Sequence, residues 1–257
     1  MNDFAEIKFQ IDDRVARITL ARPPLNIMNI AMMDEIGEAL ELCGREANLA
    51  AIVFDAADEA RAFSAGVAVE DHVPSTVVRM LDSFHRIFRL LEKISVPVVA
   101  VVNGVALGGG CELVAACDLV IASERAKFGQ PEIKLGVFPP VAAVVLPRII
   151  GEKKALEMIL LGETIDAAEA GRLGLVNYVV SGDELAARTE ELLTKLRALS
   201  SSSLRIARRA ILGDGGDFDR LLSQAENTYL HELLKTEDAN EGLQSFMEKR
   251  NPAWRHR

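Results

Sequence analysis

Cysteine is scarce in this sequence: its 257 residues contain only Cys43, Cys111 and Cys117. An odd number of cysteines, without a C-x-x-C pair, provides neither a disulfide framework nor a zinc motif. We therefore expect the chain to fold in a reducing cytoplasm. Its length suits one large domain, or a core with a smaller appendage.

The sequence also lacks a basic excess and a long apolar run. Its 29 Lys and Arg residues are outnumbered by 38 Asp and Glu residues, which gives a formal charge of −9. A nucleic-acid partner needs a basic surface that neutralises phosphates, so we expect none, although a few local cations suffice for a small polyanion. The longest apolar candidate, 96–111, is interrupted by Pro97, Asn103 and glycines, so we expect no membrane span. The first ten residues contain charges and no apolar segment, which predicts no signal peptide.

Aromatic residues make up 5% of the chain, whereas 49% of it is hydrophobic, so we expect a largely aliphatic core. Strands that alternate with amphipathic helices indicate an α/β protein. The predicted strands are 7–11, 15–20, 51–54, 97–102, 119–122 and 173–180. The predicted helices are one that Asn29 caps and that runs to Cys43, a second over 77–91, a short one from Gly108 to Cys117, and a helix-rich region from 152 onward, with a glycine-rich break at 213–216.

A glycine cluster, Gly108 to Gly110, lies between a predicted buried strand and a short helix that contains Glu112. Glycines let a ligand approach the backbone closely, and the free N–H groups at a helix start favour negative charge. The segment therefore suits an oxyanion beside a carboxylate. The alternative is a tight strand-to-helix turn in which Glu112 is an ordinary N-terminal charge.

A second carboxylate, Glu132, follows Pro131 in a predicted loop, twenty positions after Glu112. Two carboxylates in one apolar pocket have their pKa values pushed apart, which yields one acid and one base. The alternative is a pair of unrelated surface glutamates. The small-residue turn at 62–66 is a weak signal alone, but it offers a further backbone N–H to the same oxyanion.

Together these segments resemble the crotonase (enoyl-CoA hydratase/isomerase) superfamily over nearly the whole chain. The motifs that carry the resemblance are RPPLN at 22–26, FSAG at 63–66, GGGCE at 108–112, FGQPE at 128–132 and FMEKRNP at 246–252. The resemblance implies an α/β superhelix of stacked ββα turns over residues 1–198. It also implies a helical C-terminal oligomerisation region over 199–257, and a homotrimer or hexamer.

The resemblance further implies the roles of individual residues. Glu112 and Glu132 hold a water molecule and transfer protons, and the N–H groups of Ala65 and Gly109 form an oxyanion hole for the thioester. Because many isomerases of the family keep one glutamate, the presence of both favours water addition. The residues implied in coenzyme A or substrate binding are Leu25, Ile27, Ser64, Gly66, Val67, Ala68, Gly108, Pro139, Val141, Phe246 and Lys249. No metal or redox cofactor is implied, since coenzyme A is part of the acyl-CoA substrate.

Two departures from the family pattern bear on the acyl group. Ala68 stands where the family often has aspartate, and FPPVAA at 138–143 replaces glycines. With FSAGVAVEDH at 63–72, this pattern is similar to cyclohexa-1,5-diene-1-carbonyl-CoA hydratases of anaerobic aromatic degradation. Phe84, His85 and Phe88 are candidates for the acyl pocket, although a partly exposed helix histidine is the simpler interpretation of His85.

Three alternatives stay open at this point. The chain is a straight-chain enoyl-CoA hydratase, a family member with isomerase or CoA-ester hydrolase activity, or a non-catalytic scaffold that binds RNA or a protein. The acidic composition and the two glutamates disfavour the scaffold.

Overall fold

The computed structural model describes residues 4–213 and 216–257, and its centre is a six-stranded sheet. The strands are, in spatial order, β1 (Ile7–Asp12), β2 (Val15–Leu20), β3 (Ala51–Ala56), β5 (Val98–Val102), β7 (Leu119–Ser123) and β10 (Tyr178–Val180). β1 and β2 form an antiparallel hairpin, and the remaining pairs are parallel. All of the predicted strands are therefore present, although only the end of 173–180 is extended.

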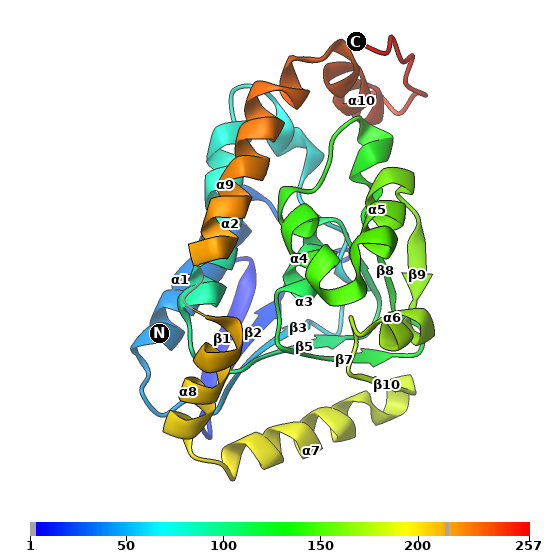
Figure 1. The fold of residues 1–257 in the computed structure, drawn as a ribbon. Helices are drawn as coiled ribbons and strands as arrows, with labels where there is room; N and C mark the ends of the chain where they lie inside the picture. The colour runs from blue at the N-terminus through cyan, green and yellow to red at the C-terminus, as the bar shows by residue number, and fades with distance from the viewer. Residues whose placement is uncertain (1–3, 214–215) are drawn as a thin grey trace.

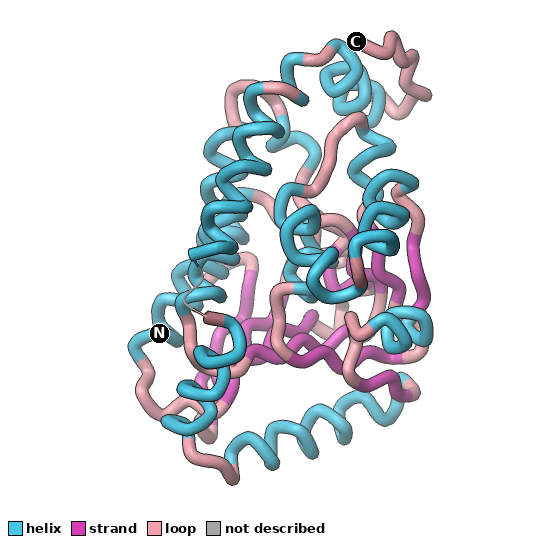
Figure 2. The backbone as a smooth tube through the Cα atoms, viewed as in Figure 1, coloured by secondary structure: helices cyan, strands magenta, loops and turns pink. Residues whose placement is uncertain are grey.

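Helices cover both faces of this sheet (Figure 2). On one face, α1 (Ile30–Arg45) and α2 (Val77–Lys93) pack side by side with their apolar residues buried. Asn29 caps α1 by accepting a hydrogen bond from the Met32 N–H at 2.9 Å, as its position before the apolar repeat predicts. On the other face lies α7 (Leu185–Arg197), whose Leu192 and Leu193 pack against the sheet.

A second sheet of four short strands was not predicted. It contains β4 (Ala62–Ser64), β6 (Val105–Leu107), β8 (Lys127–Gly129) and β9 (Thr164–Asp166), in that order. Each strand has three residues, which is too short for a period-two pattern to stand out in the sequence. The first three strands run parallel, so their carboxyl ends meet at one edge.

The remaining helices follow these strands. They are α3 (Gly109–Ala115), α4 (Pro140–Ile150), α5 (Glu152–Leu161), α6 (Ala167–Leu173), α8 (Ser201–Leu212), α9 (Gly216–His231) and α10 (Glu237–Met247). The 3-10 turns are η1 (Val69–His72), η2 (Pro131–Leu135), η3 (Gly182–Glu184) and η4 (Leu233–Lys235). α4 was not predicted as a helix, and α3 ends two residues earlier than predicted. Of the predicted break at 213–216, positions 214 and 215 lie outside the described residues.

The C-terminal helices return to the core. In Figure 1, α9 runs alongside α2, and it also packs against α4. The division of the chain at residue 198 into a core and a C-terminal region stays a prediction. α9, which lies beyond that division, contributes to the cavity described below. Within the described ranges, no helix is both long and apolar enough to cross a bilayer.

Candidate active site

The carboxyl ends of β4, β6 and β8 bring three of the predicted segments together. β4 pairs with β6 in the register Ser64 to Ala106, and β6 pairs with β8 in the register Leu107 to Gly129. Residues that follow parallel strands meet outside the same sheet edge, which is a frequent position for ligand sites. The turn after Ser64, the glycine turn at 108–109 and the segment that holds Glu132 therefore border one space.

The turn after β4 is fixed by two buried polar side chains. The Ser64 hydroxyl donates to the Asn26 carbonyl at 2.7 Å and accepts from the Gly66 N–H at 3.2 Å. The Asn26 amide donates to the carbonyls of Ala62 and Phe63 at 3.1 and 3.0 Å. Ser64 was predicted to contact the pantetheine arm, but its hydroxyl is engaged within the protein and shapes the turn. Asn26 was given no role of its own, and its only sequence signal is its place in the RPPLN motif.

Ala65 does not present its N–H to the cavity. That N–H donates to the carbonyl of Leu25 at 2.9 Å, so the predicted oxyanion donor already has a partner. The backbone of this turn is tied to the chain before α1, a long-range contact that the local motif does not reveal. The sequence-based assignment of Ala65 as an oxyanion donor therefore needs replacement.

Val67 offers a free N–H in its place. Gly66 and Ala68, on either side of it, both bond to Met28: the Met28 N–H donates to the Gly66 carbonyl at 2.8 Å, and the Ala68 N–H donates to the Met28 carbonyl at 2.9 Å. In extended backbone, the N–H of the intervening residue points the opposite way. The Val67 N–H has no hydrogen-bond partner among the residues the structure describes.

Gly109 supplies a second free N–H beside that turn. It is the first residue of α3, so its N–H has no acceptor within the helix. A Cβ placed on Gly66 would lie 3.7 Å from the Gly109 nitrogen, which shows that the two turns are in contact. A Cβ on Gly109 would lie 2.8 Å from Val67 Cγ2 and 2.9 Å from Phe84 Cζ, so only glycine fits there.

Glu112 is held in the first turn of α3, and its residue is only 2% exposed. Its Oε1 accepts a hydrogen bond from the Ala142 N–H at 2.7 Å, at the start of α4. Burial raises the pKa of Glu112 to about 7, against the opposing effect of hydrogen bonds from the N–H groups of Ala142 and Val141. The carboxyl group is therefore poised near neutral pH, where a general base works best.

Glu132 lies in η2 and packs over the glycine turn. A Cβ placed on Gly108 would lie 2.5 Å from Glu132 Oε1, and Gly108 has a φ of +52°, so both space and backbone require glycine. Glu132 Oε2 is buried and has no hydrogen-bond partner within the described residues. Burial, and then the charge of Glu112, raise the pKa of Glu132 well above its usual value. Glu132 is therefore the proton-carrying member of the pair at neutral pH.

These groups border one cavity of about 410 Å³. Eleven of the predicted residues lie in its wall: Ala65, Gly66, Val67, Phe84, His85, Gly108, Gly109, Glu112, Glu132, Pro139 and Phe246. Seven other predicted residues are not in the wall: Leu25, Ile27, Ser64, Ala68, Phe88, Val141 and Lys249. Phe88 and Val141 are buried in the core, so their side chains do not reach an acyl group in this cavity.

The wall opposite the strand edge comes from α2 and α9. His85, expected to be partly exposed, is instead 0% exposed. Its Nδ1 bonds to Glu226 Oε1 at 2.5 Å. Tyr229, on the same helix as Glu226, also lines the cavity and packs its ring edge-on against Phe138, with the centroids 5.6 Å apart. Sequence reasoning missed Glu226 and Tyr229, because nothing local links α9 to this cavity.

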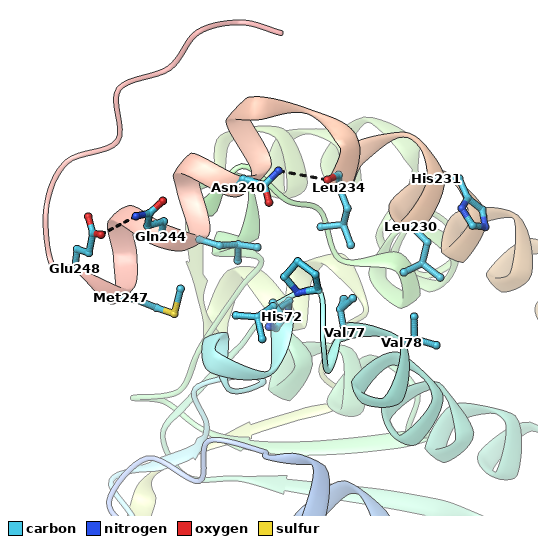
Figure 3. A pocket seen from close by; sticks show the side chains of 13 residues that line it. His72, Val77, Val78, Leu230, His231, Leu234, Asn240, Gln244, Met247 and Glu248 are labelled. Carbon is cyan, nitrogen blue, oxygen red and sulfur yellow. Dashed lines mark hydrogen bonds between the residues drawn. The ribbon is translucent and has the colours of Figure 1, made fainter.

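A second cavity of about 730 Å³ lies between η1, α2, α9 and α10 (Figure 3). Its wall is largely apolar, with Val77, Leu230 and Leu234 facing its interior. It contains neither Glu112 nor Glu132, and His72 is the residue it shares with the first cavity. The smaller cavity is therefore the one that both carboxyl groups border.

The chain is similar to known proteins over nearly its whole length. The family model for enoyl-CoA hydratase/isomerase matches residues 10–257. A probable enoyl-CoA hydratase of Mycobacterium bovis is 38% identical over 260 residues, covering 99% of each chain. A cyclohexa-1,5-dienecarbonyl-CoA hydratase of Thauera aromatica is 39% identical over 247 residues, covering 96% of this chain and 95% of the relative. The crystal structure of an enoyl-CoA hydratase from Mycobacterium avium subsp. paratuberculosis superposes with a TM-score of 0.87 at 28% identity, covering 97% of this chain and 98% of the other.

Proposed function

Because this chain belongs to the enoyl-CoA hydratase/isomerase family and is an enoyl-CoA hydratase, we propose that it hydrates a cyclic dienoyl thioester, cyclohexa-1,5-diene-1-carbonyl-CoA. Glu112 and Glu132 are the acid/base pair of this proposal. The observation that carries the hydration chemistry is that both carboxyl groups and the N–H at the start of α3, that of Gly109, border the same cavity.

The thioester carbonyl is bound by the N–H groups of Val67 and Gly109. Neither N–H has a hydrogen-bond partner among residues 4–213 and 216–257, and the two turns that hold them are in contact. Donors aimed at a developing enolate oxygen in a site shielded from water contribute about 2.7–4 kcal/mol each. This pair replaces the predicted pair of Ala65 and Gly109.

The pKa directions support one assignment of roles to the two glutamates. Glu112, held by backbone N–H groups, is the member that ionises more readily, so it takes a proton from water. The water oxygen forms a bond to the β-carbon, and the electron pair of the double bond moves toward the thioester oxygen as an enolate. Glu132 then delivers its proton to the carbon skeleton of the enolate, which restores the thioester. Transfer of the proton from Glu112 to Glu132 returns the enzyme to its starting state.

The acyl end of the cavity supports a compact, cyclic substrate. Pro139 and Pro140 lie in its wall at the start of α4, and Phe84, Phe138 and Tyr229 supply aromatic surface. Rigid prolines and flat rings suit a six-membered ring better than a flexible chain that must extend past them. The relative from Thauera aromatica, whose name specifies the cyclic diene, supports the same substrate.

Coenzyme A is proposed to leave the cavity along the turn that contains Gly66. Phe246 lies in the cavity wall and is still 53% exposed, so it is placed to contact the pantetheine arm. Leu25 and Lys249 are exposed outside the wall, and with Ile27 they stay our predicted contacts for the nucleotide part.

We also propose a homotrimer or a hexamer in the cytoplasm. Exposed apolar side chains support oligomerisation, and they lie on α5 (Leu156, Leu160 and Leu161) and on α8 (Ile206 and Ile211). The cysteines Cys43, Cys111 and Cys117 are free thiols, which supports a reducing compartment such as the cytoplasm. Sedimentation of the purified protein at micromolar concentration tests the oligomer, which a monomeric species would contradict.

The second candidate is a straight-chain enoyl-CoA hydratase, because the Mycobacterium bovis relative, which is about as similar as the one from Thauera aromatica, is named only as a probable enoyl-CoA hydratase. The deciding experiment compares kcat/KM for the cyclic dienoyl-CoA and for crotonyl-CoA, followed through the thioester chromophore. We expect the cyclic substrate to be preferred by at least tenfold, and a clear preference for crotonyl-CoA would overturn the proposal. Solvent ¹⁸O tests the reaction type, because hydration places the label on a carbon of the acyl group and thioester hydrolysis places it in a carboxylate.

A further inference from the structure

Two residues of the cavity wall carry buried polar atoms that the proposed hydration chemistry does not use. They are Nε2 of His85 and the hydroxyl oxygen of Tyr229, and neither has a hydrogen-bond partner among the described residues. A buried polar atom without a partner carries a desolvation cost. Such atoms beside a ligand cavity indicate that a ligand supplies the missing partner.

His85 is held in a defined orientation and tautomer. Its Nδ1 bonds to Glu226, and Arg89 donates to both oxygens of that carboxylate at 2.8 and 2.9 Å. Partial burial opposes ionisation of Glu226, but the hydrogen bonds from His85 and Arg89 keep its pKa below the usual value. An ionised carboxylate only accepts hydrogen bonds, so Nδ1 carries the proton. Burial lowers the pKa of His85, which leaves Nε2 of the neutral ring as a hydrogen-bond acceptor.

Tyr229 and the carboxylate that holds His85 come from the same helix. Glu226 and Tyr229 are three positions apart on α9, and residues at that spacing share one face of a helix. His85, held by Glu226, and Tyr229 both line the cavity. A hydroxyl group is the simplest ligand that serves both atoms, because it donates its one hydrogen to Nε2 and accepts a hydrogen bond from the tyrosine hydroxyl.

We propose that His85, positioned by Glu226, forms with Tyr229 a binding site for a hydroxyl group on the acyl part of the ligand. The inference rests on the proposed placement of the acyl group in the 410 Å³ cavity, but not on the identity of the cyclic diene. A site built to hydrogen-bond a hydroxyl discriminates strongly against the analogue that lacks it.

Unreactive aromatic thioesters test this site without turnover. Benzoyl-CoA and its 2-, 3- and 4-hydroxy derivatives are compared as competitive inhibitors of crotonyl-CoA hydration by the full-length protein. We expect at least one hydroxylated isomer to bind about tenfold more tightly than benzoyl-CoA, the size of effect that one such hydrogen bond gives. Tyr229→Phe and His85→Leu should each reduce this preference to about twofold or less.

Ile87→Val is the matched control. Ile87 is buried on α2 beside His85 but does not line the cavity, so its variant should keep the hydroxyl preference. Equal inhibition by all four thioesters overturns the proposal, as does a preference that survives in both Tyr229→Phe and His85→Leu. If the cyclic diene is not hydrated but the hydroxyl preference is found, the proposed substrate fails and the hydroxyl site stands.

Discussion

The hydrogen bond from the Ala142 N–H to Glu112 sets the pH at which the proposed base becomes active. Ala142 is the third residue of α4, where an N–H has no acceptor within the helix, and it donates to Glu112 Oε1 at 2.7 Å. Ala142→Pro removes this donor at a helix position where proline is tolerated better than in the interior. The proline ring also places carbon atoms against the Glu112 carboxylate, which further disfavours its ionised form.

The expected effect follows from the strength of that bond. A hydrogen bond to a charged group contributes about 1.5–3 kcal/mol, and 1.36 kcal/mol corresponds to one pH unit of titration. Starting from a pKa of about 7 for Glu112, the acidic limb of kcat/KM should move up by about one to two pH units. At pH 7 the ionised fraction then falls from about one half to between about a tenth and a hundredth, so activity falls about 5- to 50-fold.

The assay is the pH dependence of kcat/KM with crotonyl-CoA between pH 5 and 9. Ala142→Gly is the control, because it keeps the N–H and should keep the acidic limb near that of the wild type. Val141→Pro is a second test, since the Val141 N–H also stabilises ionised Glu112. Circular dichroism and melting curves establish that each variant is folded. A folded Ala142→Pro protein with an unmoved acidic limb refutes the assignment of Glu112 as the base.

Three further predictions use the same cavity and its supports. Glu132→Gln should lower kcat by several orders of magnitude and yet raise the melting temperature, more at pH 8 than at pH 5. The reason is that folding raises the pKa of Glu132, so the folded protein loses stability as the pH rises above the pKa that this carboxyl has in the unfolded chain. An unchanged melting temperature at pH 8 would argue against the burial of Glu132 as a protonated acid. Gly109→Ala should lower kcat/KM by at least about 100-fold in steady-state assays, because its Cβ would lie 2.8 Å from Val67 Cγ2 and displace an oxyanion donor; near-normal activity contradicts that role. Gly242→Ala should lower the melting temperature by several degrees, since its Cβ would lie 2.1 Å from the Leu135 carbonyl oxygen, and a stable variant would show that α10 can shift without cost.

The six-stranded sheet and the amphipathic helices were predictable because their patterns are local. The run of apolar residues in β5 and the helical repeat in α2 appear in single windows of sequence. The strands β4, β6 and β8 were not predictable, because three residues do not establish a period. Their position depends on parallel pairing between segments far apart in the chain.

The same distinction holds within the site. The glycine turn placed Glu112 and Gly109 correctly in the first turn of a helix, because that motif is contiguous. The assignment of Ala65 as an oxyanion donor was wrong, because the direction of its N–H is decided by contact with Leu25. Tyr229 was missed for a related reason, since only the packing of α9 over the core brings it to the cavity.

The ends of β4 and β6 supply backbone atoms, whereas α2, α4 and α9 supply side chains. A backbone N–H is present in every residue except proline, so the proposed carbonyl-binding part of the cavity does not depend on the side chains that vary in the helices. Divergence in the helices can therefore change which acyl group is accepted while activation of the thioester is inherited unaltered. For protein engineering, this separates the residues open to randomisation, on three helices, from a pair of turns that should be left as they are.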